Sequence, residues 1–252
     1  MKRLQSKRAL VTGGGQGLGR AIVEELLSQG CDVAIHYHSS AAGAEALRQA
    51  APAEATVRCF RADLTREGEA RELVEAAAEF LGGLDILVNN TGDLIGRRKL
   101  EALDLEFWQR VMDVNVTSTL LVTRHAVPHL AAAKQSSIVN LASLAGRMGG
   151  HAGALAYSTA KGAILTWTRS LAKELGPRGI RVNAVAPGLI LGTSFHQTHT
   201  TPEAAAATIA GIPLGRAGNP SDVARAVAFL AGEFDGFITG ATLDINGGVY
   251  GS

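Results

Sequence analysis

The chain has 252 residues, 46% of them hydrophobic, and its 24 Lys and Arg residues nearly balance its 23 Asp and Glu residues. This length and composition provide apolar surface for one large core and exclude intrinsic disorder. A net charge of +1 argues against the clustered basic surface that contacts to nucleic acid phosphates require. We therefore expect one domain over residues 1–252 and no nucleic acid partner.

Short apolar or β-branched runs alternate with segments of helical periodicity, which is typical of βα units that build a parallel sheet. In chain order, strands are predicted over 9–11, 33–35, 56–61, 86–88, 138–140, 182–185 and 242–245, and helices over 18–29, 41–49 and 67–80. Parallel strands that are buried on both faces read as continuous apolar runs, as most of these do. The pattern predicts a single-domain α/β fold of the doubly wound Rossmann type, with a seven-stranded parallel sheet.

No apolar stretch has the length of a secretory signal core or a membrane span. The two cysteines, Cys31 and Cys59, form no C-x-x-C arrangement, so neither a disulfide framework nor a thiolate metal site is indicated. We expect a soluble, cytoplasmic protein with no metal and no membrane partner.

A glycine-rich turn separates the first predicted strand from the first predicted helix. It reads Thr12-Gly13-Gly14-Gly15-Gln16-Gly17-Leu18-Gly19. Glycines permit a tight turn, and a helix N-terminus presents free amides and a partial positive charge to a phosphate. Such turns are also common as plain loops, but the position between a strand and a helix predicts a dinucleotide site.

The end of the second predicted strand distinguishes between dinucleotides. A carboxylate at this point would bind the adenosine ribose of NAD(H) and repel the 2′-phosphate of NADP(H). The chain reads Ile35-His36-Tyr37-His38-Ser39-Ser40, with no carboxylate between Asp32 and Glu45. Imidazole and hydroxyl groups can hydrogen-bond a phosphate, so we expect NADP(H) to be preferred, with NAD(H) possible. Alternatively, His36 and His38 are two residues on the same face of a strand that bind no ligand.

Tyr157 and Lys161 are four residues apart in a stretch of helical periodicity, so their side chains share one helix face. A nearby ammonium favours the phenolate, and lowering the pKa of a tyrosine by about 3 units would bring it from about 10 toward neutral pH. If the pair acts together in catalysis, we expect such a lowered pKa for Tyr157. Taken alone, the pair also fits two ordinary solvated neighbours.

Together with further motifs in the same order, these residues resemble the short-chain dehydrogenase/reductase family over essentially the whole chain. The motifs are the glycine turn, Asp63-Leu64, Asn89-Asn90-Thr91-Gly92, Asn115, Ser143, Tyr157-x-x-x-Lys161 and Pro187-Gly188. The chain looks most similar to the branch of 3-oxoacyl-thioester reductases and sugar dehydrogenases. The resemblance implies an NADP(H)-dependent reductase of a ketone. Alternatives are a sugar or polyol dehydrogenase, a pteridine reductase-like enzyme and a dinucleotide-binding redox sensor without turnover.

The resemblance also implies roles for individual residues. Tyr157 would be the general acid or base, Ser143 would polarise the substrate oxygen, Lys161 would hold the nicotinamide ribose, and Asn115 would position a water in a proton relay. The implied cofactor contacts are Thr12, Gly13, Gly15, Gln16, Gly17, Leu18, Gly19, Tyr37, His38, Ser39, Asp63, Leu64, Asn89, Thr91, Gly92, Tyr157, Lys161, Pro187, Gly188, Ile190 and Thr193. A homotetramer is implied as well.

Three features depart from the family pattern. Thr91 stands where alanine is commonest, and Thr193 stands one residue later than the threonine that usually contacts the nicotinamide carboxamide. Ser143 and Tyr157 are one residue further apart than in many relatives, which a loop through Gly149 and Gly150 would absorb.

Substrate choice is expected from segments that follow strand ends, residues 93–103, 146–156 and 188–213. The last of these is the least regular part of the chain, and we expect it to be a loop or lid. Arg97-Arg98-Lys99 is either a contact for an anionic substrate group or a solvated helix start. His151, His196 and His199 are either substrate contacts or surface loop residues.

Overall fold

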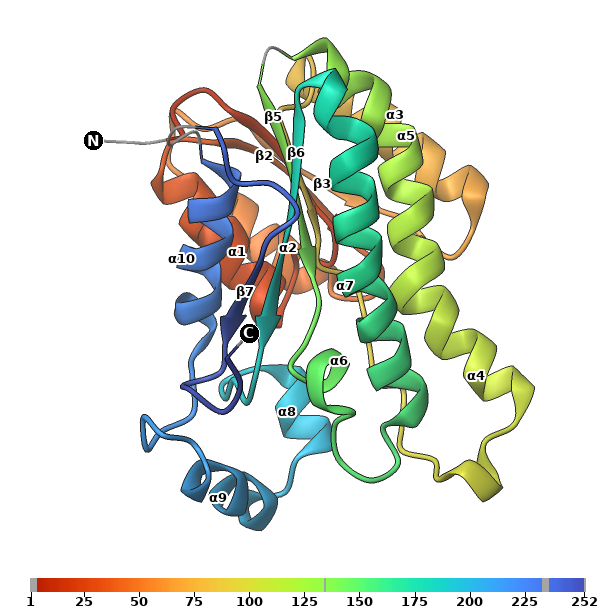
Figure 1. The fold of residues 1–252 in the computed structure, drawn as a ribbon. Helices are drawn as coiled ribbons and strands as arrows, with labels where there is room; N and C mark the ends of the chain where they lie inside the picture. The colour runs from red at the N-terminus through yellow and green to blue at the C-terminus, as the bar shows by residue number, and fades with distance from the viewer. Residues whose placement is uncertain (1–3, 134, 233–235, 252) are drawn as a thin grey trace.

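The computed structural model describes residues 4–133, 135–232 and 236–251 (Figure 1). Its strands form one seven-stranded sheet in the order β3-β2-β1-β4-β5-β6-β7, and every neighbouring pair is parallel. The strands are β1 (Arg8–Val11), β2 (Asp32–Tyr37), β3 (Val57–Arg61), β4 (Ile86–Asn89), β5 (Ser136–Leu141), β6 (Ile180–Pro187) and β7 (Thr242–Ile245). The predicted strands and the Rossmann-type fold are confirmed.

Helices cover both faces of the sheet. On one face lie α1 (Gly17–Ser28), α2 (Ala41–Ala50) and α10 (Pro220–Ala231), and on the other lie α3 (Glu67–Leu81), α5 (Ser118–Ala132) and α7 (Leu155–Leu175) (Figure 1). The helices predicted from residues 18, 41 and 67 are confirmed. The central strands β1 and β4 are buried between two helical layers, so their sequences are continuous apolar runs apart from one end residue each, whereas the edge strand β3 mixes partly buried and exposed residues.

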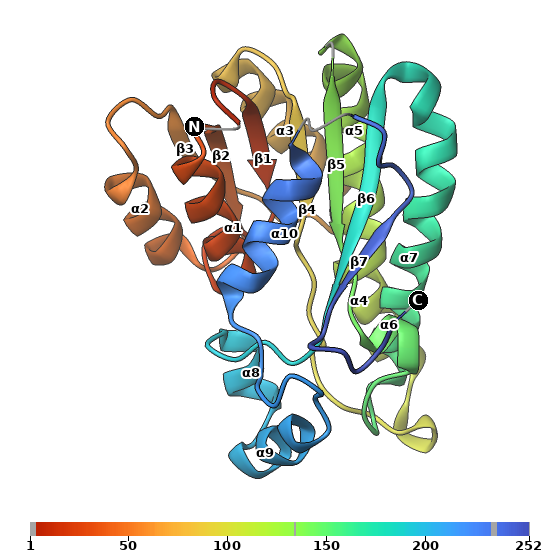
Figure 2. The ribbon, with the colours of Figure 1, turned by 60° about the vertical axis from the view of Figure 1, so that its left-hand side comes forward.

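The remaining helices include α4 (Leu105–Met112), which runs through a π-helical turn, η2 (Asp113–Thr117), into α5. Short helices α6 (Ala145–Met148), α8 (Ser194–His199) and α9 (Pro202–Ala210) lie beyond the carboxyl ends of the strands (Figure 2). Single 3₁₀ turns, η1 (Leu100–Ala102) and η3 (Gly176–Arg178), complete the list.

The segment 188–213 is more regular than its sequence suggested, because it contains α8 and α9. The side chain of Thr201 accepts a hydrogen bond from the amide of Ala204, and Pro202 occupies the first turn of α9. A threonine cap, a proline at the start and a run of alanines together favour a helix. That start signal is present in the sequence, and the expectation of an irregular stretch was wrong.

The strand order reverses between β1 and β4, since the chain builds β2 and β3 on one side of β1 and later strands on the other. Such a reversal opens a crevice outside the carboxyl ends of the two strands. The register aligns Val11 with Val88, and Val88 with Val139. These three strands therefore end within two residues of the same level.

No helix in the described ranges is long and apolar enough to cross a bilayer. Within the same ranges no three His, Cys, Asp or Glu side chains are grouped as metal ligands. Cys31 is buried, Cys59 is partly buried, and both are free thiols.

Replacing Leu87, which is fully buried in β4, with alanine should lower the free energy of unfolding by about 2–5 kcal/mol, because it leaves a cavity in the core. Leu105 is 85% exposed and makes a matched control, with an expected change within about 0.5 kcal/mol for Leu105→Ala. Urea unfolding followed by circular dichroism measures both. Equal effects would contradict the burial assigned to β4.

Candidate active site

The glycine turn forms a cradle at the N-terminus of α1. The amides of the first helical turn have no acceptors within the helix, Gln16 makes no side-chain cap, and no acidic residue lies in that turn. A Cβ on Gly19 would lie 2.0 Å from the carbonyl oxygen of Gly13, so only glycine allows α1 to pack so closely on the turn. Gly13 itself has a φ of 63°. Free amides without a competing carboxylate fit a pyrophosphate.

Thr12 ties this turn to the loop after β4. Its buried hydroxyl donates to the carbonyl oxygen of Val88 and accepts the amides of Asn90 at 2.9 Å and Thr91 at 3.0 Å. The side-chain amide of Asn90 returns hydrogen bonds to the carbonyl oxygens of Thr12 and Gly13. The side chain of Thr12 thus shapes the turn from inside the protein.

Tyr37, the last residue of β2, is half-buried, whereas His38 and Ser39 beyond it are exposed. Arg61 ends the neighbouring strand β3, opposite Tyr37, and its Nε donates to the carbonyl oxygen of His38 at 3.4 Å. This exposed guanidinium has no carboxylate partner among the residues described. It was missed in the sequence because only the pairing of β2 with β3 brings Arg61 beside His38.

Asp63 and Leu64 follow β3, but only one of them faces outward. The side chain of Leu64 is buried in the core beneath α3. Asp63 accepts hydrogen bonds from the amide and hydroxyl of Thr65. Burial opposes its ionisation, yet those bonds, together with the nearby His38 and Arg66, hold the pKa of Asp63 below its ordinary value.

Ser143, Tyr157 and Lys161 converge at the carboxyl ends of β4 and β5. Ser143 follows β5, while α7 carries the other two, and the side chain of Ser143 lies near enough to the phenol of Tyr157 to lower its pKa. The Nζ of Lys161 lies 5.7 Å from the centre of the Tyr157 ring. Lys161 is 4% exposed, and its ammonium donates to the carbonyl oxygen of Leu141 at 2.8 Å.

The longer interval between Ser143 and Tyr157 is taken up by α6 and a glycine turn. Gly149 and Gly150 have φ values of 86° and 71°, in the left-handed region that glycine adopts freely. These values show a glycine turn in the interval, and that it absorbs the additional residue stays a prediction.

Asn115 lies in the π-helical turn, a kind of helix bulge found often at functional sites. Its Nδ2 donates to the carbonyl oxygens of Val111 at 2.9 Å and Asp93 at 2.8 Å, while its buried Oδ1 has no hydrogen-bond partner in the described chain. A Cβ on Gly92 would lie 2.5 Å from that oxygen and 2.9 Å from the Nζ of Lys161. Gly92 therefore keeps the space between an unused acceptor and an ammonium free of side chains.

Other predicted cofactor residues have different surroundings. Asn89 is buried, and its amide donates to the side-chain oxygens of Thr123 and Asn140, both at 2.9 Å. The hydroxyl of Thr91 is buried and has no partner among the described residues. Pro187 ends β6, Gly188 follows it, and Thr193 is buried, with its hydroxyl 3.4 Å from the carbonyl oxygen of Ile190. Asn89 and Thr193 thus engage groups of the protein interior.

The pKa of Tyr157 moves in the direction opposite to the one expected. Burial raises it to about 12; the hydrogen bond from Ser143 opposes this effect and the charge of Asp93 adds to it. Burial also lowers the pKa of Lys161 to about 8. The expectation of a lowered tyrosine pKa was wrong for the chain by itself, because the low-polarity surroundings disfavour both charged forms.

Helix α8 reaches over the phenol. The rings of Phe195 and Tyr157 lie 5.9 Å apart, and those of Phe195 and His199 lie 5.0 Å apart. The Nε2 of His199 is 3.4 Å from an Oδ1 of Asp93, whose own carbonyl oxygen binds Asn115. Helix α8 is thus linked to the loop that holds Asn115.

The three basic residues of the 97–99 run do not act together. Arg98 pairs with Asp104 and stacks on the ring of Phe107 at 4.4 Å. Arg97 is exposed, and its guanidinium reaches the carbonyl oxygens of Ala152 and His199 at 3.4 Å and 3.5 Å. Arg97 therefore links all three expected substrate segments. His151 is exposed, and the side chain of His196 lies outside the described residues.

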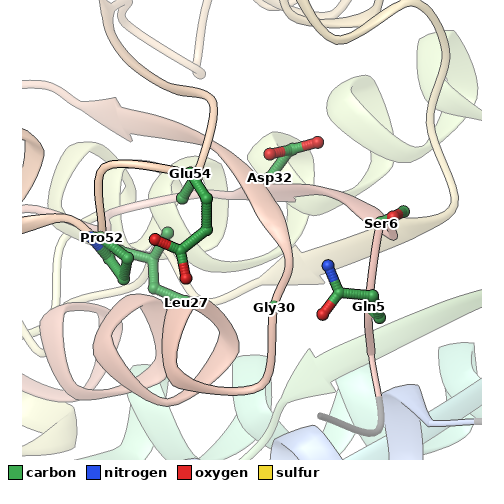
Figure 3. Close-up of a pocket in the computed structure, with 8 residues that line it drawn as sticks. Gln5, Ser6, Leu27, Gly30, Asp32, Pro52 and Glu54 are labelled. Atoms are coloured by element: carbon green, nitrogen blue, oxygen red, sulfur yellow. The ribbon is translucent and has the colours of Figure 1, made fainter.

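A small cavity of about 70 Å³ lies at the amino ends of β1, β2 and β3 (Figure 3). Gln5 and Ser6 border it from the segment before β1, Asp32 from the start of β2, and Glu54 from the loop before β3. These are amino ends of parallel strands, so the cavity is remote from Tyr157, and we assign it no substrate.

Comparison with known proteins places this geometry in a family. Residues 13–250 match a family model described as enoyl-(acyl carrier protein) reductase. The chain is 38% identical over 258 residues to the 3-oxoacyl-[acyl-carrier-protein] reductase of Aquifex aeolicus, covering 98% of this chain and 99% of that protein. The chain belongs to the short-chain dehydrogenase/reductase family. The resemblance seen in the sequence is thereby confirmed, and the protein is an NAD(P)-dependent oxidoreductase of that family.

Two solved family members show the same fold with different coenzymes in their descriptions. A short-chain dehydrogenase from Burkholderia cenocepacia in complex with NADP is 36% identical, with a TM-score of 0.89 and coverage of 98% of this chain and 99% of the other. An NADH-dependent reductase responsible for alginate metabolism is 35% identical, with a TM-score of 0.88 and full coverage of both chains. Family membership alone does not determine which dinucleotide is preferred.

Replacing Gly92 with alanine should lower kcat/KM for the NAD(P)-dependent oxidoreductase reaction about 100-fold, because the new Cβ displaces Asn115 and Lys161. The control is Gly68→Ala in α3, where a Cβ meets nothing within 4 Å. That variant should keep full activity. Steady-state kinetics and a thermal melt measure activity and folding, and a fully active Gly92→Ala enzyme would contradict the geometry described for this space.

Proposed function

We propose that the protein is an NADP(H)-dependent reductase that converts a ketone of the 3-oxoacyl-thioester type to a secondary alcohol. The observation that carries the proposal is the convergence of Ser143, Tyr157 and Lys161 at the carboxyl edge of the sheet. The similarity to the 3-oxoacyl-[acyl-carrier-protein] reductase of Aquifex aeolicus supports the substrate class.

Ser143 and Tyr157 present two hydroxyl groups to one substrate oxygen. The side chain of Ser143 lies near enough to the phenol to lower its pKa, so a carbonyl oxygen bound between the two hydroxyls would accept a hydrogen bond from each. With a pKa raised to about 12, the phenol is protonated at neutral pH and ready to act as a general acid. When bound, the nicotinamide would supply the hydride. This protonation state favours carbonyl reduction, since alcohol oxidation needs the phenol deprotonated first.

Lys161 and Asn115 would contact the nicotinamide ribose and a bound water, respectively. The ammonium of Lys161 uses one of its three donors on Leu141, which leaves two for the nicotinamide ribose. The unpartnered Oδ1 of Asn115 lies across the space beside Gly92 and would accept from a bound water on the route of the proton to Tyr157.

For the dinucleotide, we propose that amides from Gly15 to Gly19 hold the pyrophosphate, as the free first turn of α1 supports. The amides of Gly13 and Gly14 donate to His36 and would shape the turn instead. Tyr37, His38, Ser39 and Asp63 would surround the adenosine. The preference for NADP(H) is supported by the absence of a carboxylate at the end of β2 and by Arg61. A guanidinium matches the geometry of a phosphate, so Arg61 would bind the 2′-phosphate.

We also propose a cytoplasmic homotetramer in which α5 and α7 pack against their copies. Leu120 on α5 is 40% exposed, which supports an apolar contact on this helix.

Tyr157→Phe should lower kcat for NADPH-dependent reduction of an acetoacetyl thioester roughly 10²–10⁴-fold, because the proton donor is lost. Binding of NADPH, followed by its fluorescence, should remain. Tyr250→Phe removes a hydroxyl from a tyrosine that stacks on Arg147 instead, and this control should stay active. If Tyr157→Phe kept the wild-type kcat, the acid–base assignment would be wrong.

Arg61→Gln should lower kcat/KM for NADPH about tenfold or more and leave that for NADH nearly unchanged, because one charge-assisted contact to the 2′-phosphate disappears. Arg58 lies on the same strand and stacks on Phe80 at 5.2 Å. Arg58→Gln is therefore a matched control that should not change the ratio of kcat/KM for NADPH to kcat/KM for NADH. A wild-type enzyme that favours NADH, or an unchanged ratio in Arg61→Gln, counts against the coenzyme assignment.

A further inference from the structure

His36 is a buried titratable residue that the proposed chemistry does not use. It lies near the end of β2 and is 1% exposed. Its Nδ1 accepts the amide of Gly13 at 3.0 Å, and its Nε2 lies 3.1 Å from the carbonyl oxygen of Ala62. An amide only donates and a carbonyl only accepts, so these partners assign one form, a neutral imidazole with its proton on Nε2.

Those two bonds join the loops on either side of β2. Gly13 begins the turn between β1 and α1, and Ala62 immediately precedes Asp63 after β3. The backbone of β2 accepts two further hydrogen bonds at the same level. The amide of Gly14 donates to the carbonyl oxygen of His36 at 2.7 Å, and the amide of Ala62 donates to the carbonyl oxygen of Tyr37 at 3.2 Å. The imidazole thus spans the two loops that would hold the phosphates and the adenosine of a dinucleotide.

We propose that His36 is a positioning residue for the dinucleotide and makes its binding sensitive to acid, because only the neutral imidazole can accept the Gly13 amide. In the imidazolium a second N–H would face that amide. Two donors would then oppose each other in a buried site, and the glycine turn would move. The inference rests on the proposed pyrophosphate site in this turn.

The surroundings keep the imidazole neutral over a wide range. Burial lowers the pKa of His36 to about 4, and His38 acts in the same direction, while the bond to Ala62 and the charge of Asp63 oppose it. Arg61, at the end of β3, is the other charged group beside His38. The glycine turn from Thr12 to Gly19 carries no titratable side chain.

The direction of the pH effect follows from these values. Between pH 6.5 and about 4 the unfolded chain protonates His36 and the folded chain does not. The unfolded state then binds more protons, so the stability contributed by this site falls as the pH falls through that window. Dinucleotide affinity should fall as the pH approaches 4, where the folded imidazole itself takes a proton.

Two substitutions of His36 test its two hydrogen bonds one at a time. His36→Asn retains an acceptor near the Nδ1 position and should bind NADP⁺ within about threefold of the wild type at pH 7.5, by titration calorimetry. His36→Gln provides a donor toward Ala62 but no acceptor for Gly13, and its Kd should rise about tenfold. His129→Asn, in the last turn of α5 and outside the proposed dinucleotide site, is the control for the loss of an imidazole. The inference fails if His36→Gln binds as the wild type does, or if His36→Asn weakens binding as much as His36→Gln.

The ligand-free chain gives an independent readout. The free energy of unfolding in urea should fall more between pH 6.5 and 5 for the wild type than for His36→Asn. Equal pH profiles of the two proteins would overturn the proposal. In the wild type, nitrogen NMR of the imidazole should show a proton on Nε2 and no titration near pH 6.5. A chain that binds no NADP⁺ at all would refute the proposed function, whereas a proton on Nδ1 would refute the role of His36.

Discussion

Parallel pairing brings every loop that leaves a strand at its carboxyl end to one edge of the sheet, and the site consists of those loops. Val11, Val88 and Val139 are in register, so β1, β4 and β5 end within two residues of the same level. Thr12 and Asn90 then cross-link the first two loops. The apolar strands between two helical layers thus do more than stabilise the fold, because they set the height of each polar group at this edge.

Burial determines the electrostatics of the proposed catalytic groups. Lys161 is almost fully buried and has the carbonyl oxygen of Leu141 as its hydrogen-bond acceptor, while Tyr157 is half-buried beneath Phe195. The same surroundings lower the pKa of the amine and raise that of the phenol. A site in this condition stabilises a phenol that still holds its proton, which suits donation to a carbonyl oxygen. Gly92 keeps room beside the amine for the polar groups of a bound cofactor.

The sequence was sufficient for features that repeat along the chain or stand close together in it. Apolar runs identified the strands, and the spacing of Tyr157 and Lys161 placed both on one helix face. Features that depend on which strands are neighbours could not be read in this way. Arg61 lies beside His38 only because β3 pairs with β2, and His36 joins Gly13 to Ala62 only because β2 lies between β1 and β3.

Other differences concern where a side chain points and how much water surrounds it. Asn89 and Leu64 follow motif positions, yet their side chains contact the interior. The expected pKa of Tyr157 considered the charge of Lys161 and left out burial, which is the larger effect. For α9, the threonine cap, the first-turn proline and the run of alanines that favour a helix can all be read in the sequence.

A crystal structure of the protein with NADP⁺ and an unreactive 3-oxoacyl thioester analogue tests the arrangement most directly. The hydroxyl oxygens of Ser143 and Tyr157 should both lie about 3 Å from the same carbonyl oxygen, with the nicotinamide ring on the other side of that carbonyl and Lys161 on its ribose. A nicotinamide ring bound away from Tyr157, or a carbonyl oxygen that reaches neither hydroxyl, would contradict it.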